Sequence, residues 1–105
     1  MFAVSVQITG YVDDHFPGFV SCALRDAHGR VWHFVDKVPV VSLADLTDGT
    51  VYPQPGEIRC QVLSRSVDPG GRALVRIDTG GVESTDGTTI FDVFSEQLVE
   101  VARDA

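Results

Sequence analysis

Apolar and polar residues alternate with a period of two over much of this chain, which is typical of β-strands that bury one face. The clearest case runs from Glu57 to Thr79, where two alternating segments flank Asp68-Pro69-Gly70-Gly71. Proline fixes its own φ and the glycines can adopt positive φ, so this tetrapeptide favours a hairpin turn. The apolar residues expected on one face of the hairpin are Ile58, Cys60, Val62, Ala73, Val75 and Ile77.

The register of this hairpin decides where its arginines lie. With Val62 opposite Ile77 and Ser64 opposite Val75, the apolar residues of both strands coincide; a bulge at Gly71 would shift the pairing by one residue. In either register we expect a strip on the outer face that holds half of the 8 Lys and Arg residues. Its members are Arg59, Arg65, Arg72 and Arg76.

The N-terminal part predicts three further strands. We expect them over Phe2 to Ile8, ending at Gly10, over Phe19 to Arg25, and over Arg30 to Val38. The third alternates aromatic residues with other apolar residues and a histidine, so both of its faces are partly apolar. Such a strand is expected to be covered on two sides or to border a binding surface.

Two segments without a strand pattern are candidates for function. Tyr11 to Gly18 mixes aromatic residues, acids and turn formers, and is expected to be a loop. Pro39 to Gly56 is longer than most loops of compact domains, which at this length form structure or carry function. Within it, Ser42 to Leu46 is expected to form one helical turn, because Ser42 can cap it and Asp45 stands at the capping-box position.

The end of the chain completes an all-β pattern. A strand is expected over Thr88 to Phe94, a short helical turn at Ser95 to Gln97, and a last strand over Leu98 to Val101. No predicted helix is long enough to cover a sheet. We therefore expect a single β-barrel domain over residues 1–105. It would be a small closed or partly open antiparallel barrel of about six to seven strands with one or two short helical turns.

The second half of the chain resembles a known class of small barrels. Its pattern is PGEIRCQVL, then GGRALVRID, then IFDVFSEQLVEV. This order resembles the strand, hairpin, strand, helical turn and final strand of Src-homology-type small β-barrels, over Pro55 to Val101. With the N-terminal strands added, the whole chain is similar to the larger barrels of elongation-factor domains. The resemblance implies a barrel and no site residues, because the acidic loop and paired aromatics of a proline-peptide groove have no assigned counterparts.

Composition narrows the choice of partner and compartment. The 105 residues carry a net charge of −7, which disfavours nucleic acid because phosphate contacts need a basic surface. Solubility is the simplest consequence, and attraction of a basic protein is the more specific one. Without an apolar run of about 20 residues or a signal-peptide pattern, we expect a cytoplasmic protein with no membrane partner. Cys22 and Cys60 are expected to be buried and reduced.

The sequence offers no pattern typical of catalysis. It has no recognisable nucleophile context and no glycine loop that leads into a helix. The histidines His15, His28 and His33 lack close metal-ligand spacing. Asp13, Asp14 and His15 could ligate an ion loosely, but adjacent loop acids are more often solvated. We therefore expect no enzymatic activity, no catalytic residue, no cofactor and no metal.

The main hypothesis is a non-enzymatic protein-binding β-barrel module, and one form of it is an immunity-type or regulatory protein that caps a basic toxin. Aromatic residues and arginines are what binding hot spots contain. The candidate partner-binding residues are Tyr11, Asp13, Asp14, Phe16, Trp32, Tyr52, Arg59, Arg65, Arg72 and Arg76. Two simpler interpretations stay open: the aromatics plug the barrel ends, and the arginines pair with acids across strands. An arginine strip on an acidic protein would favour head-to-tail self-association.

Two other hypotheses stay open. In the first, Trp32, Phe34, Tyr52 and the long segment enclose an aromatic-lined cavity, and the chain is a small-molecule-binding barrel. The second, an RNA-binding barrel, depends on the arginines alone.

Overall fold

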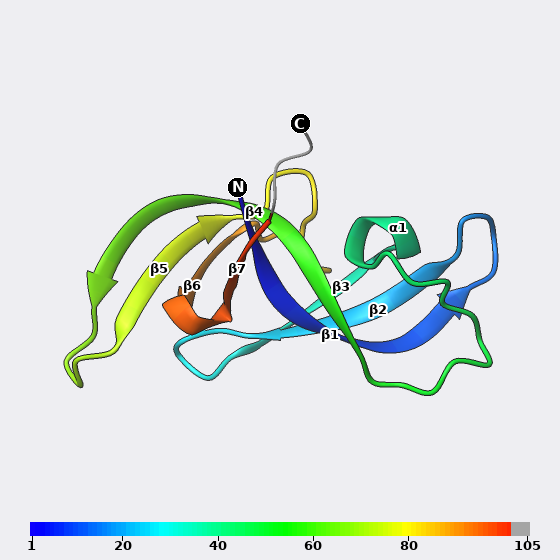
Figure 1. The fold of residues 1–105 in the computed structure, drawn as a ribbon, viewed down its shortest axis with the longest axis horizontal. Coiled ribbons are helices and arrows are strands. Elements are labelled where there is room, and N and C mark those ends of the chain that lie inside the picture. The colour runs from blue at the N-terminus through cyan, green and yellow to red at the C-terminus, as the bar shows by residue number, and fades with distance from the viewer. Residues whose placement is uncertain (102–105) are drawn as a thin grey trace.

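The computed structural model describes residues 1–101, which form one curled antiparallel sheet (Figure 1). Its strands are β1 (Phe2–Asp13), β2 (Phe19–Arg25), β3 (Val31–Lys37), β4 (Gln54–Val67), β5 (Ala73–Asp78), β6 (Ile90–Phe94) and β7 (Leu98–Glu100). The sheet has 7 strands in the order β3-β2-β1-β4-β5-β6, and β7 pairs with β1. It curls into a half-barrel, so the prediction of an all-β, partly open antiparallel barrel is confirmed. Residues 102–105 of the predicted domain lie outside the described residues.

Two long strands, β1 and β4, connect the two wings of the sheet. One edge of β1 pairs with β4 over Phe2 to Ile8, and the other edge pairs first with β7 and then with β2. The first half of β4 pairs with β1, and its second half with β5. In Figure 1 the β4–β5 hairpin forms the left wing, and β1, β2 and β3 form the right one.

The inner face of the curled sheet holds the core, as the period-two alternation predicts. All fifteen core residues are at most 8% exposed. They are Val4, Val6, Ile8, Val20, Cys22, Leu24, Phe34, Val38, Val41, Leu46, Ile58, Val75, Ile77, Phe91 and Val93. Each large side chain among them stabilises the fold by about 1.5–3 kcal/mol relative to its exposed state. Both cysteines are free; Cys22 is buried and Cys60 is half-buried.

A few contacts connect the two outer strands of the curled sheet, β3 and β6. The ring of Phe91 in β6 lies 5.1 Å from Trp32 and 5.7 Å from Phe34, both edge-to-face. The backbone N–H of Thr85 donates to the carbonyl of His33 at 2.8 Å. These contacts bring β6 close to β3 without continuous strand pairing, so the barrel is only partly closed.

The predicted strand limits hold for β2 and are close for β3, but β1 is longer than expected. Its bulges after Ile8 and Tyr11 let it bend while it keeps pairing with β2 as far as Asp13. The predicted loop over Tyr11 to Gly18 is therefore shortened to residues 14–18. The helical turn η1 (Ser95–Gln97) lies where the sequence predicts it.

The helical turn predicted at Ser42 to Leu46 is wrong. The helix is α1 (Val38–Val41), with a proline in its first turn and Ser42 as its C-terminal cap. Proline suits a first turn because its φ is preset and its missing N–H would be unpaired there anyway. Val38 and Val41 are both buried, so tertiary packing also favours this position. The next strand then begins at Gln54.

The hairpin register is only partly as predicted. Val62 pairs with Ile77, but Arg65 takes the place opposite Val75 that was expected for Ser64. The reason is a bulge between Val62 and Ser64, within the strand rather than at Gly71. Directly opposite residues point to the same face. Arg65 therefore lies on the inner side with Val75, and the predicted single outer strip of four arginines is wrong.

Candidate protein-binding surface

Two loops meet at one end of the molecule, at the right of Figure 1. One comprises residues 14–18, between β1 and β2, and the other comprises residues 42–53, between α1 and β4. The N–H of Val38 donates to the carbonyl of Gly18 at 2.9 Å, which holds α1 beside the first loop. Residues from both loop segments therefore form a common surface.

Two tyrosines support these loops. The ring of Tyr11 packs on Gly18, where a Cβ atom would lie 2.6 Å from the tyrosine hydroxyl oxygen. The hydroxyl of Tyr52 donates to the carbonyl of Thr47 at 2.7 Å. Both rings also pack against the core. Tyr11 and Tyr52 are thus partly buried supports of the loops, as the barrel-end interpretation of the aromatics expects.

Charges from both loops act on the Tyr11 hydroxyl. Its pKa is raised, first by desolvation and then by the negative charges of Asp14 and Asp48. Asp14 lies in the first loop and Asp48 in the second, so charges from both loops act on the same hydroxyl. We call the surface made by Tyr11, Asp13, Asp14, Phe16, Asp45, Asp48 and Tyr52 the acidic end.

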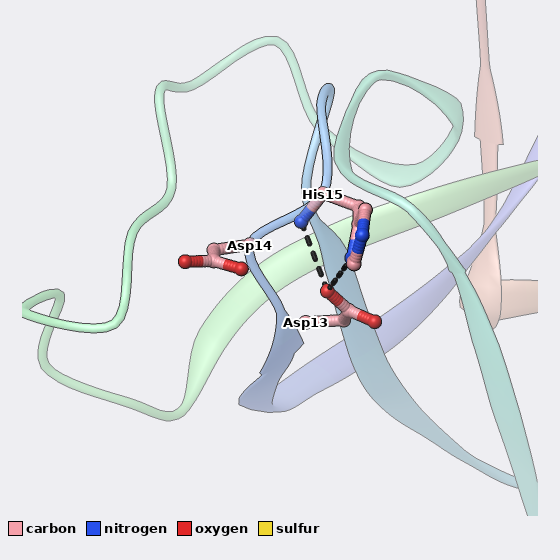
Figure 2. A group of neighbouring side chains, drawn as sticks. All are labelled: Asp13, Asp14 and His15. Atoms are coloured by element: carbon pink, nitrogen blue, oxygen red, sulfur yellow. Dashed lines mark hydrogen bonds and ion pairs between the residues drawn. The ribbon is translucent and has the colours of Figure 1, made fainter.

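Asp13, Asp14 and His15 form a compact group at the start of the first loop (Figure 2). The Asp13 Oδ1 atom accepts hydrogen bonds from the His15 backbone N–H at 2.9 Å and lies 2.7 Å from its ring Nδ1. The backbone hydrogen bond and then the ring contact lower the pKa of Asp13, and the Asp13 carboxylate raises the pKa of His15. Their potential ligand atoms all lie within 4.8 Å of one another. Three exposed consecutive residues fall short of the six to eight oxygens that calcium takes, and the imidazole is already bound to a carboxylate.

The acidic end combines free carboxylates with exposed apolar side chains. Among residues 1–101, Asp14, Asp45 and Asp48 form no ion pair. On the same loops the side chain of Phe16 is 97% exposed, and that of Leu43 is fully exposed. Exposed large apolar side chains that gather on one surface are typical of protein-binding surfaces, and here they lie on the same loops as the free carboxylates.

Trp32 lies away from the acidic end. Its indole N–H donates to Asp26 Oδ2 at 2.9 Å, and the Arg30 guanidinium lies 3.7 Å from its ring centroid. Phe34 is completely buried. Both rings contact the same core phenylalanine. They therefore fill the interior between β3 and β6, where the small-molecule hypothesis expected them to line a cavity.

The four candidate arginines have four separate environments. Arg72 pairs with Glu96 and lies 3.4 Å from the ring centroid of Phe94, and Arg76 donates to Asp92 at 2.8 Å and 3.2 Å. Arg59 donates to the Met1 sulfur at 3.4 Å, and Arg65 lies 5.7 Å from the Phe2 ring. For Arg72 and Arg76 the structure has the acid pairing that the simpler interpretation expects.

Sequence reasoning did not include Leu43, Asp45 and Asp48 among the candidates. Leu43 and Asp45 were assigned to the predicted helical turn, and Asp48 with Gly49 to its close. The available signal was their position in the long segment from Pro39 to Gly56. This segment contains the two aspartates and no Lys or Arg. Only the folded chain shows that this segment lies beside the 14–18 loop.

Comparisons of this protein with protein-family models, with characterised proteins and with solved structures find no match. The resemblance to Src-homology-type barrels stays an interpretation of the sequence pattern over Pro55 to Val101. Within residues 1–101, no helix is long and apolar enough to cross a membrane.

Proposed function

We propose that this protein is a non-enzymatic β-barrel module that binds a basic protein through its acidic end. The observation that carries the proposal is that two loops at one end of the molecule hold the exposed carboxylates of Asp14 and Asp48 together with the exposed ring of Phe16. Neither carboxylate has an ion-pair partner among residues 1–101. A basic partner would supply the missing charges.

In the proposed complex, charge speeds association and apolar contact area supplies most of the binding energy. Exposed carboxylates on one end produce a local negative field, which speeds the encounter with a positive partner. Exposed ion pairs add little affinity by themselves. The exposed ring of Phe16 supplies apolar area beside the carboxylates, and buried aromatic contacts dominate binding energy.

The proposal needs neither catalysis nor a cofactor. The carboxylates of Asp14, Asp45 and Asp48 at the acidic end are exposed, which suits recognition. We place the protein in the cytoplasm, where free thiols such as those of Cys22 and Cys60 persist. One form of the proposal is an immunity-type function, in which the acidic end caps a basic toxin such as a nuclease. Its support is small size, net charge and the position of the free carboxylates.

The test compares two variants of equal net charge. Asp14→Asn with Asp48→Asn removes two charges from the acidic end, and Glu83→Gln with Glu100→Gln removes two from elsewhere. Neither control residue has an ion pair among residues 1–101. Tagged wild-type protein and both variants are used to capture proteins from the native lysate at low and high salt, with quantification by mass spectrometry.

We expect one basic protein to be retained by the wild type and the control, and much less by the acidic-end variant. Its association rate constant should fall roughly three- to tenfold in that variant and become less sensitive to salt. Equal retention by the two variants would show that the acidic end does not bind the partner.

A further inference from the structure

A groove runs beside the acidic end, between α1 with the residues that follow it and strands β1, β4 and β7. It consists of two adjoining hollows of about 160 Å³ and about 510 Å³. Both hollows are lined by Val41, Ser42, Leu43 and Glu57, so they form one continuous depression. Figure 1 shows α1 next to β4, which forms part of the opposite wall.

The rim of the groove exposes apolar side chains. Leu43 is fully exposed, and Val40 and Val99 are each 40% exposed. All three line the groove: Val40 and Leu43 come from α1 and the residues after it, and Val99 comes from β7. Large apolar side chains that gather around a hollow are typical of an interaction site, whereas single exposed residues are not.

Gly56 is one of the residues that line the groove. A Cβ atom there would lie 2.8 Å from Ile8 Cγ1 and 3.0 Å from the carbonyl oxygen of Val41. Glycine thus lets the end of α1 approach β4 directly. This close approach holds the end of α1, and with it the following segment that carries Leu43, against β4.

The charges around the groove select its occupant. Glu57 lines the groove, and Asp45 lies in the same short segment as Leu43. Among residues 1–101 neither carboxylate is ion-paired, and Asp48 of the acidic end follows three residues after Asp45. The one lining cation, Arg59, lines only the smaller hollow and donates to the Met1 sulfur. The loop side of the groove is therefore apolar with a negative border, which fits a segment that is apolar and positively charged.

We propose that the groove takes an apolar side chain of the basic partner, from a segment in which Lys or Arg residues flank it. The apolar side chain enters between Leu43 and Val99, and the flanking cations face Asp45 and Glu57. The inference rests on the proposed function, because it gives the same basic partner a defined anchor next to the acidic end.

The test uses random dodecapeptides displayed on phage, selected against wild-type protein. The most enriched peptide is then synthesised, and its dissociation constant is measured by fluorescence anisotropy. The groove variant is Leu43→Ser with Val99→Ser, and the single variant Leu43→Ser accompanies it because a fully exposed side chain contributes nothing to folding. The matched control is Leu63→Ser with Ile90→Ser, at positions that are 45% and 50% exposed and do not line the groove.

We expect enriched peptides to carry a large apolar residue flanked by Lys or Arg, and to bind the groove variant at least about tenfold more weakly than the control. Equal affinity for the groove variant and the control, or no enriched basic peptide, would overturn the proposal. The variant Asp14→Asn with Asp48→Asn separates the two claims. If only the Asp14→Asn with Asp48→Asn variant loses affinity for the peptide, the acidic end binds the partner and the groove does not. If only the groove variant loses affinity, the groove binds the apolar side chain and the acidic end does not contribute.

Discussion

The indole N–H of Trp32 donates to Asp26 Oδ2 at 2.9 Å, across the turn that joins β2 to β3. The other oxygen of this buried carboxylate accepts the backbone N–H groups of His28 at 2.9 Å and Arg30 at 3.0 Å. One aspartate thus closes the turn and orients the aromatic ring that contacts β6.

Removal of the Asp26 carboxylate should destabilise the fold. Asp26→Ala leaves three donors without their acceptor, so we expect the free energy of unfolding to fall by about 2–3 kcal/mol. Asp26→Asn keeps one acceptor oxygen and should lose less. Urea unfolding followed by the fluorescence of the only tryptophan checks both values. Equal stability of wild type and Asp26→Ala would contradict the role given to this carboxylate.

A methyl group at Gly56 should be poorly tolerated. The added Cβ of Gly56→Ala would lie 2.8 Å from Ile8 Cγ1 and 3.0 Å from the Val41 carbonyl oxygen. Overpacking of this kind costs about 1–3 kcal/mol. Gly81→Ala is the matched control, because no atom lies within 4 Å of the position of its added Cβ. Chemical denaturation should show a loss for Gly56→Ala and little change or a small gain for Gly81→Ala.

Asp92 should make stability depend on pH in the acid range. Hydrogen bonds from Arg76 are the largest cause that lowers its pKa from 3.8 to about 2. A lowered pKa in the folded state stabilises the fold above the unfolded pKa, and this contribution is lost as pH falls from about 4 toward 2. Asp92→Asn should therefore reduce the unfolding free energy by about 1 kcal/mol at pH 6, since the group is partly solvated, and by nearly nothing at pH 2. A pH-independent difference, measured against Glu83→Gln as control, would exclude this linkage.

His15 should titrate above its ordinary pKa. The Asp13 carboxylate raises the pKa of His15 from 6.5, because it favours the protonated imidazole. The positive charge is present below this raised value and is lost as pH rises through it, so the acidic end becomes more negative over that interval. Titration of the ring protons by NMR should show a midpoint above 6.5, and Asp13→Asn should return it to about 6.5. An unchanged midpoint in the variant would mean that the pair is not formed.

The two thiols should differ in reactivity. Burial, and secondarily the charge of Asp36, raises the pKa of Cys22 to about 11, so its thiolate is scarce at pH 8. Burial also raises the pKa of the half-buried Cys60. Reaction with a disulfide reagent should modify Cys60 first and leave Cys22 protected until the protein unfolds. Separate Cys22→Ser and Cys60→Ser variants assign each phase, and a faster phase from Cys22 would contradict the burial argument.

The candidate site could be predicted in part from the sequence. Tyr11, Asp13, Asp14, Phe16 and Tyr52 stand in segments that lack strand pattern and are rich in aromatic or acidic residues, and the structure gathers them at one end. Trp32 was grouped with them for its residue type alone. Its hydrogen bond to a buried aspartate could not be inferred, because it depends on how the turn before β3 closes.

The sequence alone determined the elements whose signals are local. Alternation over Phe19 to Arg25 predicts β2 and its buried face, because a strand with one face in the core must repeat every two residues. The apolar residues of β4 and β5 likewise predict that the two strands form a hairpin with Val62 opposite Ile77. The curled all-β architecture follows from such strands, since no long helix was available to cover the sheet.

Only the tertiary structure decided which distant residues meet. The bulge between Val62 and Ser64 turned Arg65 to the inner side, and neither the alternation nor the turn at Asp68-Pro69-Gly70-Gly71 predicts a bulge at that point. Burial of Val41 placed the helix before Ser42. The same packing placed Asp14 and Asp48 at one end of the molecule, where the charges of both raise the pKa of Tyr11. Free carboxylates from separate segments can form one charged surface only after long-range pairing has fixed both loops.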